Sequence, residues 1–235
     1  LEETYCQSLG VEYMYIRSSE VLEWIQQKME SSKGRANYSA EEKFQIFSKL
    51  SEAVGFENFL DKKFVGQKRF SLEGCEALIP ALDQVISHGA NLGIREFVMG
   101  MAHRGRINVL ANIFRKDVQS IFAEFEGKEY DDDEDFSGDV KYHLGYSDLV
   151  QVGENQVRIT LSPNPSHLEA VGPVVEGLSR AFAESAHQSD YSRIAPIIIH
   201  GDAAIAGQGV VYEVIQMAKL EGYKTGGSIH IVVNN

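Results

Sequence analysis

Residues 195–235 read APIIIHGDAAIAGQGVVYEVIQMAKLEGYKTGGSIHIVVNN, and this stretch decides the fold class. The apolar run APIIIH at 195–200 predicts a strand that is buried on both faces, and SIHIVV at 228–233 predicts a second strand. Between them, GVVYEVIQMAKLEG at 209–222 has the apolar spacing of a helix. Strands that alternate with helices in this way are typical of a parallel sheet.

The same alternation continues upstream as far as Phe64. Strands are expected at 95–101 and 157–162, and helices at 71–93, 107–116 and 173–187. We therefore predict an α/β fold with a mostly parallel sheet and helices on both faces.

The first 62 residues have a different pattern, because only helical periodicity occurs there. The two expected helices are at 18–31 and 39–60. Ser39 with Glu42 three positions later is typical of the start of a helix. We expect a small helical segment at 1–62, followed by the α/β domain at 63–235.

The composition excludes several classes of partner. Lys plus Arg is 22 and Asp plus Glu is 34, so the net charge is −12, which argues against a general nucleic-acid binder. No apolar run approaches membrane-spanning length, and the two cysteines, Cys6 and Cys75, fit a reducing compartment. The acidic run Asp131–Asp135 is expected to be a solvated loop. The chain lacks an initial methionine and stops directly after a strand-like segment, so we expect it to be a piece of a longer protein.

Polar clusters follow four of the expected strands. They are MAHRGR at 101–106, SPNPSHLE at 162–169, HGDAAIAGQG at 200–209 and NN at 234–235. Because ligands bind at the carboxyl ends of strands in open parallel sheets, the four clusters predict one site. Three of the clusters also have an ordinary structural alternative: Asn235 could cap a turn, His167 could bond at a helix start, and Arg104 could pair with a surface acid.

Asp202 indicates a diphosphate that is bound through a metal ion. A carboxylate repels phosphates unless a cation lies between them, and Mg²⁺ prefers oxygen ligands such as Asp202 and Asn235. The small residues of GDAAIAGQG leave backbone N–H groups free to face an anion. A dinucleotide site fits less well, because Tyr212 stands where the third glycine of the fingerprint is needed.

Gly201-Asp202-Ala203, followed after 30 residues by Asn234-Asn235, resembles the thiamine diphosphate motif. The blocks FVGQKRFSLEG, GMAHRGRINVLANIF, SGDVKYHLG, NPSHLEAVGPVVEG and HGDAAIAGQGVVYE are similar to the 2-oxoglutarate dehydrogenase component family. The resemblance is dense from about Asp61 to Asn235. Most thiamine diphosphate enzymes have glycine at the place of Ala203, but the 2-oxoglutarate branch has alanine. The resemblance implies a thiamine diphosphate-binding fold.

The resemblance also implies roles for individual residues. It implies Asp202 and Asn235 as ligands of Mg²⁺. It implies His103 and His143 as catalytic histidines near the substrate. The cofactor-binding residues that it implies are Arg104, Ser166, His167, Leu168, Asp202, Ala203 and Asn235.

The implied reaction is an oxidoreductase reaction of the citric acid cycle, the thiamine diphosphate-dependent oxidative decarboxylation of 2-oxoglutarate. The succinyl group then passes to a lipoyl group on a partner succinyltransferase, and the full-length chain forms a homodimer. The implied location is the cytoplasm of a bacterium or the mitochondrial matrix of a eukaryote. In the family, the glutamate that activates the cofactor belongs to a second domain. We find no candidate for it here and expect the chain alone to be inactive.

Three alternatives stay open. A 2-oxoadipate dehydrogenase paralogue would share nearly all of these motifs and differ in the length of the substrate pocket. A non-catalytic interaction domain could keep the fold without the cofactor, although it would have no physical need for polar clusters at four strand ends. The third is a dinucleotide-binding oxidoreductase, against which the incomplete glycine fingerprint argues.

Overall fold

The computed structural model describes residues 1–125 and 143–234. The expected acidic loop at Asp131–Asp135 and the predicted ligand Asn235 therefore lie outside the described residues. The chain divides into two compact units, Leu1–Phe47 and Ser48–Asn235. Within the described residues, no helix combines the length and apolar character needed to cross a membrane.

The first unit is helical, as the periodicity predicts. It contains α1 (Glu2–Tyr5), α2 (Ser19–Ser32) and the start of α3 (Ala40–Lys63). At the start of α3, the Glu42 N–H donates to Ser39 Oγ at 3.1 Å, and the Ser39 N–H donates to the Glu42 carboxylate at 2.8 Å. This reciprocal pair satisfies two backbone donors that a helix start leaves open, and it confirms the expected boundary.

The second unit contains a five-stranded sheet with the strand order β2-β3-β1-β4-β5. The strands are β1 (Glu96–Met101), β2 (Tyr146–Val152), β3 (Asn155–Leu161), β4 (Ile194–Gly201) and β5 (Ile229–Val233). β1 pairs in parallel with β3 and β4, and β4 pairs in parallel with β5. The prediction of a mostly parallel sheet is confirmed. The antiparallel edge strand β2 was not expected.

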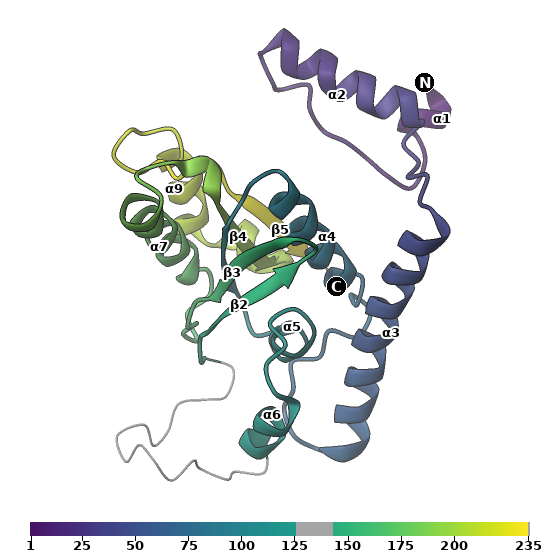
Figure 1. Cartoon of the computed structure of the whole chain (residues 1–235), viewed down its shortest axis with the longest axis vertical. Helices are drawn as coiled ribbons and strands as arrows, with labels where there is room; N and C mark the ends of the chain where they lie inside the picture. Colours follow the sequence, from purple (N-terminus) through teal and green to yellow (C-terminus); the bar gives the residue numbers. More distant parts are fainter. Residues whose placement is uncertain (126–142, 235) are drawn as a thin grey trace. The chain divides into compact units, whose positions relative to one another are not determined.

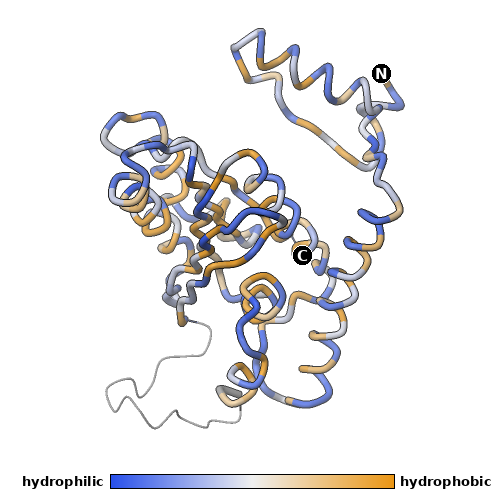
Figure 2. Tube along the Cα trace, viewed as in Figure 1, coloured by the Kyte–Doolittle hydropathy of each residue, from blue (hydrophilic) through white to orange (hydrophobic). Residues whose placement is uncertain are grey.

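Helices cover both faces of this sheet (Figure 1). On one face, Phe97 and Met99 of β1 pack in a core with α4 (Leu78–Asn91), α5 (Arg106–Asn112) and the end of α3. On the other face, Val98 packs against α7 (Val171–Ala186), beside which lies α9 (Gly209–Met217). This division follows from the alternation of side chains along a strand, and Figure 2 shows the hydrophobic stretches that run through the sheet.

The close approach of α7 to β1 depends on Gly100. A Cβ atom at Gly100 would lie 2.6 Å from Val175 and 3.0 Å from Val171, both on α7. Any other residue at Gly100 would therefore push α7 away from the sheet. Because α7 follows the polar segment at the end of β3, Gly100 also helps to fix the place of that segment.

Some helix boundaries differ from the prediction. The helix expected at 71–93 begins only at Leu78, because turns occupy the residues before it and Gly74 has a φ of +86°. The helix expected at 209–222 ends at Met217. The short elements α6 (Val118–Phe125), α8 (Asp202–Gly207) and the 3₁₀ turn η1 (Tyr191–Arg193) were not expected as separate elements.

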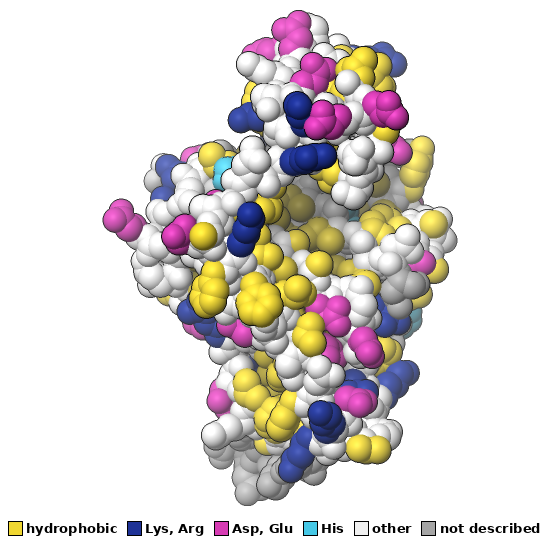
Figure 3. Space-filling view, turned by 90° about the vertical axis from the view of Figure 1, so that its right-hand side faces the viewer, with side chains coloured by type: hydrophobic (Ala, Val, Ile, Leu, Met, Phe, Trp, Pro, Cys, Tyr) yellow, Lys and Arg dark blue, Asp and Glu magenta, His cyan; other side chains and the backbone are white. Residues whose placement is uncertain are grey.

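Hydrophobic side chains also remain on the surface. Figure 3 shows them between charged residues on one side of the molecule. Exposed apolar residues of α3 in the second unit are Leu50, Val54 and Phe59, whereas Ala53, Glu57 and Leu60 of the same helix are buried. α3 therefore carries apolar residues on its exposed side as well as on its core side, unlike an ordinary amphipathic surface helix.

Candidate active site

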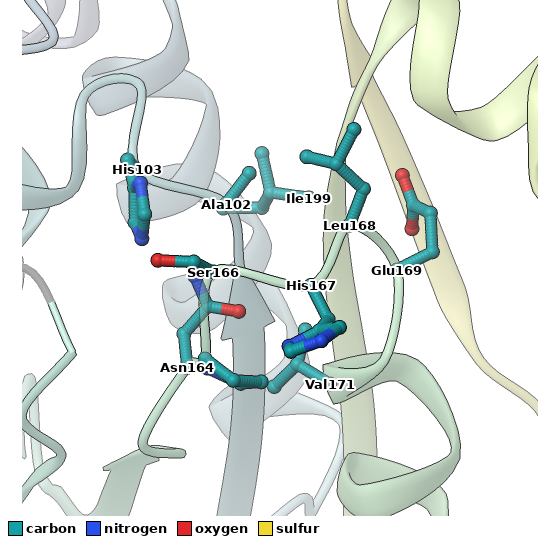
Figure 4. Close-up of a pocket in the computed structure, with 10 residues that line it drawn as sticks. Ala102, His103, Asn164, Ser166, His167, Leu168, Glu169, Val171 and Ile199 are labelled. Atoms are coloured by element: carbon teal, nitrogen blue, oxygen red, sulfur yellow. The ribbon is translucent and has the colours of Figure 1, made fainter.

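A pocket opens at the carboxyl ends of β1, β3 and β4 (Figure 4). One wall is the segment that follows β3, and the opposite wall comes from the residues that follow β1. Among its lining residues are His103, Ser166, His167, Leu168, Glu169 and Ile199. Because β1, β3 and β4 are parallel, the polar clusters that follow them lie at one edge of the sheet.

The two predicted histidines lie side by side at this edge. The ring centroids of His103 and His143 are 5.1 Å apart, with an angle of 31° between the planes. His143 Nε2 lies 3.0 Å from Ser166 Oγ, and the Phe70 ring packs 4.9 Å from His103 on another side. These contacts bring His143 together with the polar clusters that follow β1 and β3, although it lies 40 positions after His103 in the sequence.

The environment of His103 favours its neutral form. Burial lowers the pKa of His103 below its ordinary value, and the nearby His143, Arg106 and Lys68 lower it further. A neutral imidazole near pH 7 offers one N–H donor and one nitrogen acceptor. His103 can therefore donate a hydrogen bond to an anionic ligand or accept a proton.

Arg106 is a fully buried cation whose charge acts on His103, and it was not predicted as a site residue. Its guanidinium donates to the backbone carbonyls of Met101 at 3.3 Å, Leu144 at 2.7 Å and Ser162 at 2.8 Å. These carbonyls belong to the end of β1, to the neighbour of His143 and to the end of β3. Burial lowers the pKa of Arg106 to about 10, so the side chain is still positively charged at pH 7.

The turn between His103 and Arg106 is tight and rests on the loop before α4. Gly105 has a φ of +73°, and a Cβ atom there would lie 2.6 Å from Leu72. The Gly105 N–H donates to the carbonyl of Phe70 at 2.9 Å. The predicted cofactor contact Arg104 is exposed, and its guanidinium donates to the Ser71 carbonyl at 3.1 Å. The structure therefore places Arg104 against this loop and not among the residues that line the pocket.

Glu57 of α3 holds that loop in place, a role that was not predicted from the sequence. Its buried carboxylate accepts hydrogen bonds from Ser71 Oγ at 2.8 Å, from the Leu72 N–H at 3.1 Å and from Asn108 Nδ2 at 3.0 Å. Asn108 lies on α5, directly after the Arg106 turn. The buried carboxylate therefore connects α3, the loop before α4 and α5 in one network.

Ser166, His167 and Leu168 form the exposed wall of the pocket. The next residue, Glu169, is buried and has a φ of +66°. Its carboxylate binds His200, which precedes the predicted metal ligand Asp202 by two positions. Neither Glu169 nor His200 was predicted as a site residue.

Asp202 begins α8 at the end of β4, and its side chain is exposed. Within the described part of the chain, its carboxylate has no hydrogen bond or ion pair. Gly201 pairs with Val233, so Asp202 and Asn234 continue from adjacent strand ends. An exposed, unpaired carboxylate beside the amide-bearing end of β5 is a donor set that fits a hard cation such as Mg²⁺. Ala203 follows Asp202 in α8 and is exposed too.

A search for groups of three or more His, Cys, Asp and Glu side chains suited to a metal ion finds none among the described residues. A site made of one carboxylate, one amide and ligand oxygens does not require such a group.

The mostly parallel sheet, its polar strand ends and the pocket are typical of a ligand-binding α/β domain. The profile of the dehydrogenase E1 component family matches residues 48–235, and the chain belongs to this family. Along its whole length the chain is 48% identical to the 2-oxoglutarate dehydrogenase E1 component of Cupriavidus necator and 48% identical to that of Azotobacter vinelandii. It is 46% identical, over 237 aligned residues, to the 2-oxoglutarate dehydrogenase-like, mitochondrial protein of Pongo abelii.

The chain spans only part of these relatives. It covers 24% of the Cupriavidus protein, 25% of the Azotobacter protein and 23% of the Pongo protein. The family membership therefore concerns one region of a protein family whose members are about four times as long.

Proposed function

We propose that the chain forms the diphosphate-binding region of a thiamine diphosphate-dependent 2-oxoglutarate dehydrogenase. The whole enzyme decarboxylates 2-oxoglutarate oxidatively and transfers the succinyl group to a lipoyl group on a partner succinyltransferase. The single observation that carries this proposal is the position of Gly201-Asp202-Ala203 at the end of β4, in register with the end of β5. The identity to enzymes named for 2-oxoglutarate supports the choice of substrate.

Thiamine diphosphate, when bound, supplies the electron sink for decarboxylation. Asp202 and Asn235 would hold the Mg²⁺ that carries the diphosphate. Ala203 and the exposed residues Ser166, His167 and Leu168 would contact the cofactor. Arg104 would be a further contact, and for this role its guanidinium would share or leave the carbonyl of Ser71.

His103 and His143 would bind the substrate. 2-Oxoglutarate carries two carboxylates, and its distal carboxylate remains after CO₂ has left. The buried charge of Arg106 acts on His103, and its guanidinium bonds the carbonyl next to His143, so the local field would attract an anion while the lowered pKa keeps His103 neutral. His103 and His143 would donate hydrogen bonds to the substrate and move protons near its reacting carbon.

The further expectations concern the whole protein. A homodimer and a lipoyl-bearing partner follow from the proposed reaction, as does a location in the bacterial cytoplasm or the mitochondrial matrix. Preference for 2-oxoglutarate over 2-oxoadipate is part of the proposal, because the relatives in both bacteria carry 2-oxoglutarate in their names.

The decisive assay measures CO₂ release from 2-oxoglutarate by the full-length enzyme, with and without thiamine diphosphate and Mg²⁺. We expect release only when both are present, and faster turnover with 2-oxoglutarate than with 2-oxoadipate. Release that does not depend on the cofactor would contradict the proposal, as would faster turnover with 2-oxoadipate.

A variant tests the metal ligand directly. We expect Asp202→Ala to abolish Mg²⁺-dependent binding of thiamine diphosphate in calorimetry, because it removes the only charged protein ligand that we assign. The circular dichroism spectrum should not change, since the side chain is exposed at a strand end. Asp148→Ala is the matched control, because Asp148 is an exposed aspartate on the edge strand β2. Normal cofactor affinity in Asp202→Ala would show that the motif has been misread.

A further inference from the structure

Glu169, His200 and His230 form a chain of hydrogen bonds beside the pocket. Glu169 Oε2 lies 2.6 Å from His200 Nδ1, and His200 Nε2 lies 2.8 Å from His230 Nδ1. The side chains of Glu169 and His200 are only 5% and 2% exposed. The imidazoles of His200 and His230 stack with their centroids 5.1 Å apart and their planes 12° from parallel. Figure 4 shows Glu169 on the opposite side of the loop from His103.

Glu169, His200 and His230 each lie on a segment that carries proposed cofactor or metal ligands. Glu169 directly follows Leu168, the last of the three exposed residues in the pocket wall. His200 is in β4, two positions before Asp202. His230 is in β5, the strand that ends beside Gly201. The hydrogen bonds therefore connect the ends of the segments that would have to bind one diphosphate together.

The backbone at Glu169 indicates that the contact with His200 is specific. A φ of +66° is a conformation that residues with a side chain rarely adopt. It turns the chain between the exposed wall and α7, so that Leu168 stays in the pocket and the Glu169 carboxylate is buried. A buried carboxylate needs a hydrogen-bond donor, and the Nδ1–H of His200 supplies it. The unusual conformation is thus held by the pair that it creates.

The hydrogen bond to Glu169 also sets the tautomer of His200. With Nδ1–H donating to the carboxylate, Nε2 of a neutral His200 accepts the Nδ1–H of His230. Both rings then have a fixed orientation, and β4 and β5 are linked through side chains as well as through their backbones.

We propose that Glu169 and His200 are positioning residues, which hold the wall Ser166–Leu168 at the distance from Asp202 that a metal-bound diphosphate requires. This inference rests on the proposed function. Glu169 and His200 do not themselves touch the cofactor in this proposal. They act by joining the end of the wall directly to the strand that leads to Asp202, as outer partners of metal ligands commonly do.

The test uses the full-length enzyme with Mg²⁺ in excess and measures the Kd of thiamine diphosphate by calorimetry. Glu169→Leu removes the carboxylate and keeps a side chain of similar size. We expect its Kd to rise about tenfold or more, the range found when an outer partner of a metal ligand is removed. Glu169→Gln keeps an oxygen that accepts the Nδ1–H of His200, so its Kd should stay within about threefold of the wild type. The KM for 2-oxoglutarate should change little in both variants.

Thr225→Val is the matched control. Thr225 is buried, and its hydroxyl donates to Glu176 Oε2 at 2.6 Å, which ties the segment before β5 to the middle of α7. The variant removes a buried hydrogen bond that does not involve Glu169, His200 or the wall Ser166–Leu168. We expect a lower melting temperature and an unchanged Kd.

Three results would overturn the proposal. The first is a folded Glu169→Leu variant with the wild-type Kd. The second is an equal rise in Kd in Thr225→Val, since the effect would then follow from lost stability. If Glu169→Leu does not fold, His200→Gln takes its place, and a wild-type Kd in that variant is the third. Failure of the proposed function itself would look different, because the wild-type enzyme would then not bind thiamine diphosphate.

Discussion

The site contains two pairs of histidines that are alike in separation and opposite in surroundings. The ring centroids are 5.1 Å apart in both His103–His143 and His200–His230. The buried cation Arg106 acts on His103 of the first pair and bonds the carbonyl next to His143, whereas the second pair is bonded to the buried carboxylate of Glu169. The comparison shows that two histidine pairs with the same ring spacing can have buried charges of opposite sign beside them.

At His103, burial opposes protonation, and the positive charge of Arg106 adds to this effect and attracts anions. The result is a neutral His103 at an open pocket, which suits contact with a dianionic substrate. Behind the second pair, the carboxylate fixes one nitrogen of His200 and leaves the other for His230. That arrangement suits a structural connection between strand ends. The predictions below test this difference, from the largest expected effect to the smallest.

Removal of the buried cation should have the largest effect. Arg106→Met leaves the carbonyls of Met101, Leu144 and Ser162 without their donor inside the protein. An unsatisfied buried polar group costs roughly 1 to 3 kcal/mol, so we expect the free energy of unfolding to fall by about 3 kcal/mol or more. Denaturant titration of the wild type and the variant measures this difference.

Arg158→Met provides the control for that experiment. Arg158 is a half-exposed arginine whose Nε lies 3.6 Å from Glu96, and such exposed pairs contribute about 1 kcal/mol or less. Equal losses of unfolding free energy in Arg106→Met and Arg158→Met would show that the buried arginine stabilises the fold no more than an exposed one does.

The histidines of the first pair should affect catalysis more than cofactor binding. We expect His103→Ala and His143→Ala each to lower kcat/KM for 2-oxoglutarate about tenfold or more, because a hydrogen bond to a charged group contributes roughly 1.5 to 3 kcal/mol. The Kd of thiamine diphosphate should change much less, in contrast to the Kd of Glu169→Leu. Steady-state kinetics and calorimetry on the full-length enzyme separate the two effects.

His88→Ala serves as the control for this pair, since His88 is exposed on α4. If His103→Ala and His143→Ala keep the wild-type kcat/KM while folded and loaded with cofactor, both histidines are structural. The distinction between the two pairs would then be wrong.

The centre of the fold was predictable because its strands β1 and β4 are buried on both faces. β4 reads as an unbroken apolar run, and burial of all its residues but the last explains that pattern. β2 was missed because it lies at the edge of the sheet, where most of its residues are at least partly exposed and polar residues interrupt the pattern. An edge strand is defined by its pairing with β3, which apolar periodicity does not reveal.

The site was predictable only where short motifs carry it. Asp202 and the wall Ser166–Leu168 stand in recognisable blocks of sequence. Burial of a charged residue is a tertiary property, so nothing in the sequence near Arg106 or Glu169 indicated it. The partners of His200 are 31 and 30 positions away, and a buried polar contact of this kind has no periodic signal. His200 itself could have indicated a buried polar contact, because it is a titratable residue in an otherwise apolar strand.

Replacement of Ser166 should lower kcat/KM less than replacement of His103 or His143. The Ser166 hydroxyl lies 3.0 Å from His143 Nε2, and a neutral hydrogen bond contributes about 0.5 to 1.5 kcal/mol. We therefore expect Ser166→Ala to lower kcat/KM about two- to tenfold. Ser147→Ala is the control, because Ser147 of the edge strand β2 makes a hydroxyl contact of the same 3.0 Å length with Thr160 of β3. An unchanged kcat/KM in Ser166→Ala would mean that His143 does not need this partner.

The smallest expected effect is a pH dependence of stability that differs between the pairs. The pKa of His103 is lowered in the folded protein, so between that value and the ordinary value of 6.5 the unfolded chain binds more protons. The free energy of unfolding should therefore rise with pH through this window and gain nothing more from His103 above it. The difference in unfolding free energy between the wild type and His103→Gln, measured from pH 5 to 8, isolates this contribution. A difference that falls as the pH rises would show that the charged form of His103 is favoured.

His230 completes the comparison, because it is the member of the second pair that the solvent reaches. Burial and His200 lower the pKa of His230, but the carboxylates of Glu176 and Glu169 act in the opposite direction. All of the influences on His103, by contrast, lower its pKa. The difference in unfolding free energy between the wild type and His230→Gln should therefore change with pH in the same direction as the difference for His103→Gln. Replacing Glu169 with Gln should make this change with pH larger. If Glu169→Gln leaves this pH dependence unchanged, the carboxylate of Glu169 does not act on the imidazole of His230. The effect of the buried carboxylate would then be limited to His200.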